Sequence, residues 1–267
     1  MKFEVWDVHT HPRYAPPPHT PKDIVKEVLE EMQRCAVAKA VLSPANWGGN
    51  LKNEDYYGAN TEISRTMKKH RKKFFCFCRV SPKFPGAIEE LERSITALGM
   101  QGVKLHPAMD NFYPDSSNYF QIFERIVKLK VPVLFHTNPP HGEWERSSPA
   151  RILKIAQAFP QMKIILAHIL SAPKDIKLSP RKASQYTKET IQEAKDLSKV
   201  YLDTSQLKEK KKLEFVVKTL GANRILFGSD YPWGKMDETM KVILESSLSD
   251  QQKKLILREN LRTLMTL

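Results

Sequence analysis

Short apolar segments that alternate with amphipathic segments constrain the fold of this chain more than any other feature. Each apolar segment has the length of a strand, and each amphipathic segment repeats its apolar residues at helical spacing. The alternation recurs along 267 residues at roughly thirty residues per unit, which is the arithmetic of a (β/α)₈ barrel. An open doubly wound sheet would carry a glycine-rich phosphate loop after its first strand, and none stands there. We therefore predict an α/β fold, a (β/α)₈ TIM-type barrel that forms a single domain over residues 1–267.

The expected strands are short and several end in polar residues. They span Phe3–His11, Ala38–Ser43, Phe74–Val80, Gly102–Pro107, Val131–His136, Met162–His168, Val200–Asp203 and Arg224–Phe227. Helices are expected over Pro21–Met32, Asp55–His70, Ala87–Leu98, Tyr119–Leu129, Ala150–Ala158, Lys182–Leu197 and Leu213–Leu220, and two helical segments close the chain. Thr20 is placed to cap the first helix, and Ser249 and Gln252 have capping-box spacing before the last.

The composition predicts a soluble, cytoplasmic protein. No apolar run approaches the length of a membrane span, and Met1 leads into a short strand instead of a signal peptide. The three cysteines, Cys35, Cys76 and Cys78, form no disulfide framework and are expected to pack as small apolar residues. The formal net charge is +13. The lysines, however, fall largely in helical stretches without interleaved stacking aromatics, which disfavours a nucleic-acid surface.

Two histidines stand where the first strand ends. His9 and His11 are two residues apart, and residues with this spacing in a strand point to the same face. Both imidazoles therefore project together, at a spacing that suits one metal ion. Such a pair can also be a solvated feature of the surface. This pair follows an apolar strand and precedes a proline-rich loop, which favours the metal interpretation.

Later strands end in the same way. Lys104 and His106 end the fourth strand, His136 the fifth and His168 the sixth, and Asp230 follows the eighth. In such a barrel the carboxyl ends of the strands converge on one face, where the chemistry of these enzymes is located. Imidazoles with a carboxylate suit Zn²⁺, Mn²⁺ or Fe²⁺, and the absence of cysteine from these positions argues against a closed structural zinc site. The sequence thus predicts a metal site at the C-terminal ends of the strands.

Several segments together resemble one known family. The start Asp7-Val8-His9-Thr10-His11 looks like the signature of the amidohydrolase superfamily. Its amidohydrolase-2 branch is similar to this chain over Gly102–Pro107, Phe135-His136, Phe159–His168, Leu226–Pro232 and Asn260-Leu261-Arg262. This branch includes aminocarboxymuconate-semialdehyde decarboxylase, γ-resorcylate decarboxylase and several lactonases. Many relatives are dimers, so the resemblance allows a homodimer.

The resemblance implies a role for each of the polar strand ends. His9, His11, His136 and Asp230 would bind one divalent metal ion, with Zn²⁺ as the first expectation and Mn²⁺ or Fe²⁺ as alternatives. A bound metal lowers the pKa of its water towards neutrality, and Asp230 would accept the proton of that water. His168 would stand beside the metal, to polarise the substrate or to move a proton.

Lys104 opens a binuclear alternative. Members of the superfamily with two metals place a carbamylated lysine at the end of the fourth strand, and the sixth-strand histidine, here His168, then binds the second metal. His106 would be a substrate contact or a supporting residue. Asp7, two residues before His9, either orients a metal ligand or is a buried structural carboxylate.

Candidate substrate contacts lie in the expected top loops and at the strand ends. Arg13 and Arg79 have the side chain that reads a carboxylate through two hydrogen bonds. The other candidates are His106, Trp47, Trp144 and Trp233, of which the tryptophans would wall an apolar pocket. Packing or a position on the rim explains any one of these residues equally well.

These features predict an enzyme with a small-molecule substrate, and the arginines would suit a carboxylate. We expect a metal-dependent hydrolase of a small cyclic amide, ester or lactone, because hydrolysis is the commoner chemistry in the superfamily. The alternative is a non-oxidative, metal-dependent decarboxylase or hydratase of a small aromatic or unsaturated carboxylic acid. A TatD-like nuclease is disfavoured because the fourth strand reads Gly102-Val103-Lys104 instead of a Gly-Glu signature. A non-catalytic binding protein is the remaining alternative.

Overall fold

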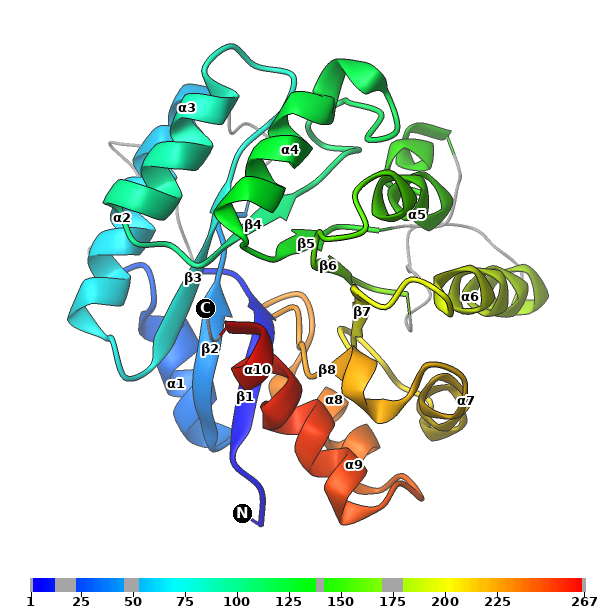
Figure 1. The fold of residues 1–267 in the computed structure, drawn as a ribbon. Coiled ribbons are helices and arrows are strands. Elements are labelled where there is room, and N and C mark those ends of the chain that lie inside the picture. Colours follow the sequence, from blue (N-terminus) through cyan, green and yellow to red (C-terminus); the bar gives the residue numbers. More distant parts are fainter. Residues whose placement is uncertain (1, 13–22, 46–52, 138–141, 170–179, 266–267) are drawn as a thin grey trace.

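Eight parallel strands form the centre of the molecule. The computed structural model describes residues 2–12, 23–45, 53–137, 142–169 and 180–265. The strands pair in chain order: β1 (Val5–Thr10), β2 (Val37–Leu42), β3 (Phe74–Arg79), β4 (Gly102–Leu105), β5 (Val133–Phe135), β6 (Ile164–Leu166), β7 (Val200–Asp203) and β8 (Ile225–Leu226). Figure 1 shows the strands at the centre and the helices around them. The predicted (β/α)₈ barrel is confirmed.

Backbone hydrogen bonds join the first strand to the residues that directly follow the last strand. The Val8 N–H donates to the Phe227 carbonyl at 2.9 Å, and the Asp230 N–H donates to the His9 carbonyl at 2.8 Å. Thr10 also forms a parallel bridge with Tyr231. Residues from opposite ends of the chain therefore meet at the carboxyl ends of these two strands.

The helices follow the predicted alternation. They are α1 (Lys26–Arg34), α2 (Asn53–Lys69), α3 (Ala87–Glu92), α4 (Phe120–Leu129), α5 (Pro149–Ala158), α6 (Pro180–Ala194), α7 (Lys210–Leu220), α8 (Met236–Leu244), α9 (Asp250–Lys254) and α10 (Asn260–Met265). Short 3₁₀ turns lie at Ser117–Tyr119, Gly142–Ser147 and Ala222–Arg224. The predicted capping box is confirmed, because Ser249 and Gln252 each bond the backbone N–H of the other.

Helix boundaries differ from the predictions in several places. Helix α6 ends at Ala194 instead of Leu197, α7 begins at Lys210 instead of Leu213, and a π-helical segment, Leu255–Glu259, joins α9 to α10. Helix α1 begins at Lys26 and not at Pro21, because the Asp23 carboxylate accepts a hydrogen bond from the Val25 N–H and holds a turn before the helix. The predicted cap Thr20 and Pro21 lie outside the described residues. The helix predicted over Ala87–Leu98 changes at Arg93 to a π-helical segment that ends at Ala97. The spacing of apolar residues does not distinguish a continuous α-helix from an α-helix that ends in a π-helical turn.

Two layers of apolar side chains hold the barrel together. The inner layer includes Trp6, Val8, Val41, Phe77, Leu134, Ile165 and Leu226, and α10 adds Leu261, Leu264 and Met265 to it. The outer layer packs the other faces of the strands against the surrounding helices. Trp6 stands near the start of β1, and the Arg258 guanidinium, just before α10, lies 5.5 Å from its ring. Helix α10, red in Figure 1, therefore covers the amino-terminal end of the barrel. The candidate site lies at the opposite end, where the strands have their carboxyl ends.

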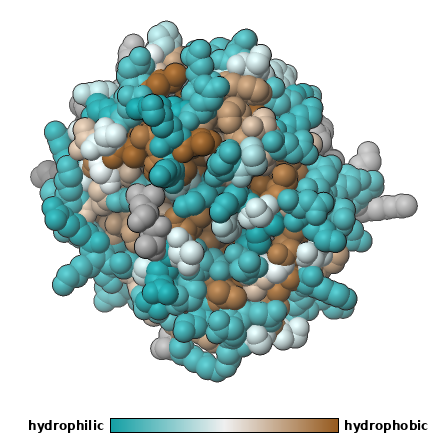
Figure 2. Space-filling model, viewed as in Figure 1, coloured by the Kyte–Doolittle hydropathy of each residue, from teal (hydrophilic) through white to brown (hydrophobic). Residues whose placement is uncertain are grey.

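The surface agrees with the predicted cysteine packing and charge distribution. Cys35, Cys76 and Cys78 are buried free thiols. Exposed lysines and Arg71 follow one another at the end of α2, in the run from Lys68 to Lys73. Figure 2 shows hydrophilic residues over most of the face seen in Figure 1, with smaller hydrophobic areas between them. Among the described helices, none has the length and apolar character needed to cross a bilayer.

Candidate metal centre and active site

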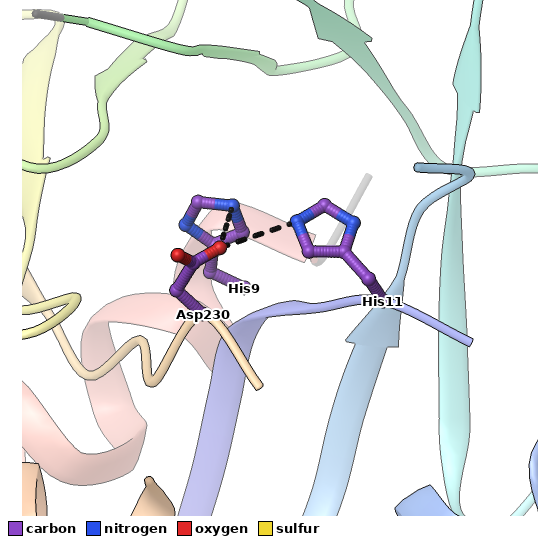
Figure 3. Close-up of side chains that lie close together, drawn as sticks. All are labelled: His9, His11 and Asp230. Atoms are coloured by element: carbon purple, nitrogen blue, oxygen red, sulfur yellow. Dashed lines mark ion pairs between the residues drawn. The ribbon is translucent and has the colours of Figure 1, made fainter. Parts of the chain in front are cut away.

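The centre of the candidate site comes from β1 and from the loop after β8. The register of β1 against β2 shifts between Asp7 and Thr10, and irregularities of this kind re-aim side chains. Val8 belongs to the inner core, and the next residue, His9, also points into the barrel. Figure 3 shows His9, His11 and Asp230 side by side. The Asp230 Oδ1 atom lies 3.3 Å from His9 Nε2 and 3.4 Å from His11 Nε2.

These three side chains have the chemistry of a metal site. Their ligand atoms lie within 4.8 Å of one another, and all three side chains are buried. Burial lowers the pKa of both histidines, so each imidazole keeps a lone pair at neutral pH. Burial alone would raise the pKa of Asp230, but His168, His9 and His11 outweigh it and hold that pKa below its usual range. Two neutral imidazoles and an ionised carboxylate are the donors that a divalent ion requires.

Three further histidines line the same end of the barrel. The rings of His106 and His136 stack, with centroids 3.7 Å apart and planes 11° apart, and His168 lies 4.7 Å from His136. The His168 ring is 5.1 Å from that of His9. Burial and neighbouring positive charges lower the pKa values of His106 and His136. Among the described residues, His136 falls outside the group of three whose ligand atoms lie within 4.8 Å, so its role as a metal ligand stays a prediction.

Two buried cations adjoin the histidines. Arg79 and Lys104 are register partners on the neighbouring strands β3 and β4. The Lys104 Nζ atom lies 3.0 Å from His9 Nε2. Burial lowers the pKa of Lys104 to about 8, so this side chain is still mostly charged at neutral pH. Carbamylation of Lys104 and a second metal stay predictions.

Arg79 is held by an acidic partner that the sequence did not reveal. Its Nη2 atom lies 3.2 Å from Asp110 Oδ1, which also accepts a hydrogen bond from the Tyr56 hydroxyl at 2.7 Å. The guanidinium is 4.9 Å from the ring of Tyr56. Among the described residues, Arg79 Nε and Asp110 Oδ2 find no hydrogen-bond partner. Arg79 thus stands beside the histidines with donor capacity that its partner does not use.

The end of β7 and the loop after it supply residues that the sequence analysis missed. Asp203 Oδ2 lies 2.7 Å from His9 Nδ1, and Ser205 Oγ lies 3.0 Å from His168 Nδ1. The Gln206 amide donates to Asp230 Oδ2 at 2.8 Å. The signal for Asp203 was present, because it ends a predicted strand as the histidines do. The positions of Ser205 and Gln206 depend on how the loop folds back.

Three residues at this end of the barrel have left-handed backbones. The φ angles are 62° for His168, 56° for Gln206 and 62° for Asp230. Non-glycine residues avoid this region, and strained residues of this kind cluster at functional sites. Each of the three follows a strand, so the turn directs its side chain across the top of the barrel.

Asp7 is a buried carboxylate that holds the backbone of the candidate ligand His9, so the structure is compatible with both roles considered for it. Its Oδ1 atom accepts the N–H groups of His9 and Ser229, at 2.9 and 3.1 Å. Burial raises the pKa of Asp7 to about 7, and hydrogen bonds from Ser229 and His9 oppose that rise. Asp7 therefore ties the end of β1 to the loop after β8.

The other predicted substrate contacts lie mostly beyond what the structure describes. Arg13 and Trp47 fall outside the described residues, as does the side chain of Trp144. Trp233 is half exposed, and its ring meets that of His11 edge-on at 5.1 Å. It thus stands at the rim of the site, next to a candidate metal ligand.

Comparison with known protein families assigns this chain to a family that fits its fold and its site. The chain belongs to the amidohydrolase family, whose Amidohydro_2 description matches residues 6–264. The family resemblance inferred from the sequence is thereby confirmed.

Several proteins that this chain is similar to are decarboxylases. Gamma-resorcylate decarboxylase from a Polaromonas species is 25% identical over 249 residues, which cover 76% of this chain and 74% of that protein. A solved dihydroxybenzoic acid decarboxylase from Polaromonas, with bound manganese and the inhibitor 2-nitroresorcinol, is 19% identical with a TM-score of 0.76, over 98% of this chain and 97% of that one. A 5-carboxyvanillate decarboxylase from Sphingomonas paucimobilis is 16% identical with a TM-score of 0.75, over 99% of each chain.

These similarities bear on two predictions, the reaction that the enzyme catalyses and the metal that it binds. Decarboxylation, the alternative drawn from the sequence, has better support than hydrolysis of a cyclic amide, ester or lactone. A divalent metal is supported by the His-His-Asp group and by the manganese of a relative. Zinc stays a prediction.

Proposed function

We propose that this protein is a metal-dependent, non-oxidative decarboxylase of a small hydroxylated aromatic acid. The observation that carries the proposal is the contact of the buried cation Lys104 with His9, together with Arg79, the register partner of Lys104 on β3. An anionic carboxylate substrate would meet positive charge on this side of the site. The activities of the relatives favour loss of that carboxylate over hydrolysis.

The residues fit a divalent ion. His9, His11 and Asp230 would hold it, and His136 is the predicted fourth ligand. When bound, the ion supplies the positive charge that binds and polarises the oxygens of an acidic substrate. The amide of Gln206 keeps Asp230 in place, which limits the reorganisation needed on binding.

The remaining residues would handle the substrate and the proton. Arg79 would offer its Nε–H, which has no partner among the described residues, to the substrate carboxylate. His168 would deliver a proton to the ring carbon that carries this group. The carbon–carbon bond then breaks, its electron pair returns to the ring, and carbon dioxide leaves. The balance is one carboxylate and one proton in, one arene and one carbon dioxide out.

The test is an activity screen in the presence of Mn²⁺. The acid probes are 2,6-dihydroxybenzoate and 5-carboxyvanillate, and simple lactones are the comparison compounds. We expect release of carbon dioxide from at least one acid and, in D₂O, one deuterium at the carbon that lost the carboxylate. His168→Asn should lower kcat by about 10²–10⁴-fold while metal content is retained.

Two results would overturn the proposal. One is hydrolysis of lactones without decarboxylation of either acid, which would favour the hydrolase that the sequence predicted. The other is decarboxylation that persists in Asp230→Asn at the wild-type rate, because the reaction would then not use this site.

A further inference from the structure

Asp203 is the most heavily hydrogen-bonded carboxylate described in the candidate site. Its Oδ1 atom accepts the N–H of His168 at 3.1 Å, the N–H of Ser205 at 3.0 Å and the Ser205 hydroxyl. Its Oδ2 atom lies 2.7 Å from His9 Nδ1. The Asp203 side chain is fully buried, so solvent does not compete for these bonds. The Asp203 carboxylate therefore contacts both His9, a candidate metal ligand, and His168, the proposed proton donor.

The contacts of Ser205 decide which nitrogen of His168 carries a proton. A hydroxyl has one hydrogen, and Ser205 donates it to Asp203. Ser205 Oγ must therefore act as acceptor towards its other neighbours, the His168 N–H at 3.1 Å and His168 Nδ1 at 3.0 Å. A second acceptor, Asp230 Oδ2, lies 4.0 Å from the same nitrogen. The proton of a neutral His168 thus belongs on Nδ1, and Nε2 keeps its lone pair.

The same reasoning applies to His9. Its Nδ1 atom faces Asp203, which can only accept, so this nitrogen donates. Its Nε2 atom faces the Lys104 amine at 3.0 Å, a donor, so this nitrogen accepts. The two contacts agree, and they leave the His9 lone pair on the nitrogen nearest Asp230.

We propose that Asp203, acting directly on His9 and through Ser205 on His168, is a positioning residue that fixes the tautomers of both histidines. His9 then presents Nε2 to a metal ion, and His168 keeps Nε2 to take up and deliver a proton. The second role rests on the proposed decarboxylase function, while the tautomers themselves do not. The same carboxylate also accepts the backbone N–H of His168, whose φ is 62°, and so stabilises the turn that aims this ring.

The test is NMR of the full-length chain, freed of metal and labelled with ¹⁵N in its imidazoles, so that the contacts of the protein alone decide the tautomer of His9. Long-range ¹H–¹⁵N correlations show which ring nitrogen is protonated. In the wild type we expect the proton of both His9 and His168 on Nδ1. Ser205→Ala should move the proton of His168 to Nε2, or populate both forms, without changing His9. Asp203→Asn should change both, because an amide nitrogen cannot accept from His9.

Ser43→Ala is the matched control. The Ser43 hydroxyl lies 3.2 Å from His11 Nδ1, much as Ser205 lies beside His168. The Ser43 carbonyl already accepts from the same nitrogen at 3.0 Å, so removal of the hydroxyl should leave the tautomer of His11 unchanged. The signals of His70, at the end of α2, report whether each variant is folded.

Two functional measurements complete the test. Asp203→Asn should weaken Zn²⁺ binding by about 10–100-fold, whereas Ser205→Ala should bind Zn²⁺ as the wild type does and lose about 10–100-fold in kcat with KM unchanged. An unchanged His168 tautomer in folded Ser205→Ala would overturn the inference even if the enzyme is a decarboxylase. If no acid is decarboxylated, the proposed function fails, and the tautomer and Zn²⁺ measurements still decide the inference.

Discussion

Replacement of Gly228 by alanine probes how tightly the site is packed. Gly228 is buried in the turn between β8 and Asp230. A Cβ atom built on it would lie 3.1 Å from the Cβ atoms of His9 and Asp203 and 3.2 Å from Asp203 Oδ2. These neighbours would have to move by a few tenths of an ångström. Asp203 is held by four hydrogen bonds, so it has little freedom to do so.

The expected cost follows from that contact. Overpacking a close-packed interior costs about 1–3 kcal/mol. Alanine also restricts the unfolded chain more than glycine does, which stabilises the folded state by about 0.4–1 kcal/mol. We expect the free energy of unfolding to fall by about 1–2 kcal/mol. Displacement of His9 should also weaken Mn²⁺ binding by about 10-fold.

The assay pairs urea unfolding with calorimetric titration of Mn²⁺. Gly99→Ala is the control, because Gly99 has a φ of 73° and open space around its absent Cβ. A left-handed alanine there should cost about 1–2 kcal/mol and leave Mn²⁺ binding unchanged. Wild-type Mn²⁺ affinity in Gly228→Ala would refute the claim that Gly228 sets the position of His9.

Three further predictions concern stability, each measured by urea unfolding. Asp110→Ala leaves the buried Arg79 charge unpaired and should cost about 3–5 kcal/mol; a cost below about 1 kcal/mol would contradict a buried ion pair. Asn260→Ala removes two hydrogen bonds, at 2.7 and 2.6 Å, to backbone carbonyls and should cost about 1–3 kcal/mol, with wild-type stability as the contrary result. Hydrogen bonding from Arg34 lowers the pKa of Glu31 below its ordinary 4.5. The stability that results is present above pH 4.5 and is lost as the pH falls through the folded-state pKa of Glu31. In Arg34→Ala the free energy of unfolding should therefore fall less steeply with decreasing pH. An equally steep loss in the variant would contradict that prediction.

The barrel was predictable because its signals are local. Each strand is a short apolar run, each helix repeats its apolar residues every three or four positions, and Ser249 marks a helix start by side-chain chemistry alone. The histidines at the strand ends were predictable for a related reason. The fold itself gathers the carboxyl ends of parallel strands, so a polar residue at each end is placed without knowledge of the loops.

The rest of the site depends on the geometry of the loops. The pairing of Arg79 with Asp110 joins β3 to the turn after β4, and no local pattern relates residues 31 positions apart. Ser205 and Gln206 reach His168 and Asp230 because the chain adopts left-handed conformations at several of these turns. Such conformations are fixed by the packed surroundings and leave no signal in side-chain type.

The metal content of the purified chain tests the central claim most directly. We would purify the protein without added metal and compare the wild type with Asp230→Asn and Lys104→Ala by elemental analysis. The site predicts about one divalent ion per chain in the wild type and in Lys104→Ala, and none in Asp230→Asn, because Asp230 is the carboxylate ligand. Two ions per chain that are lost in both variants would contradict a mononuclear site. Equal metal content in all three proteins would show that the ion does not bind at His9, His11 and Asp230.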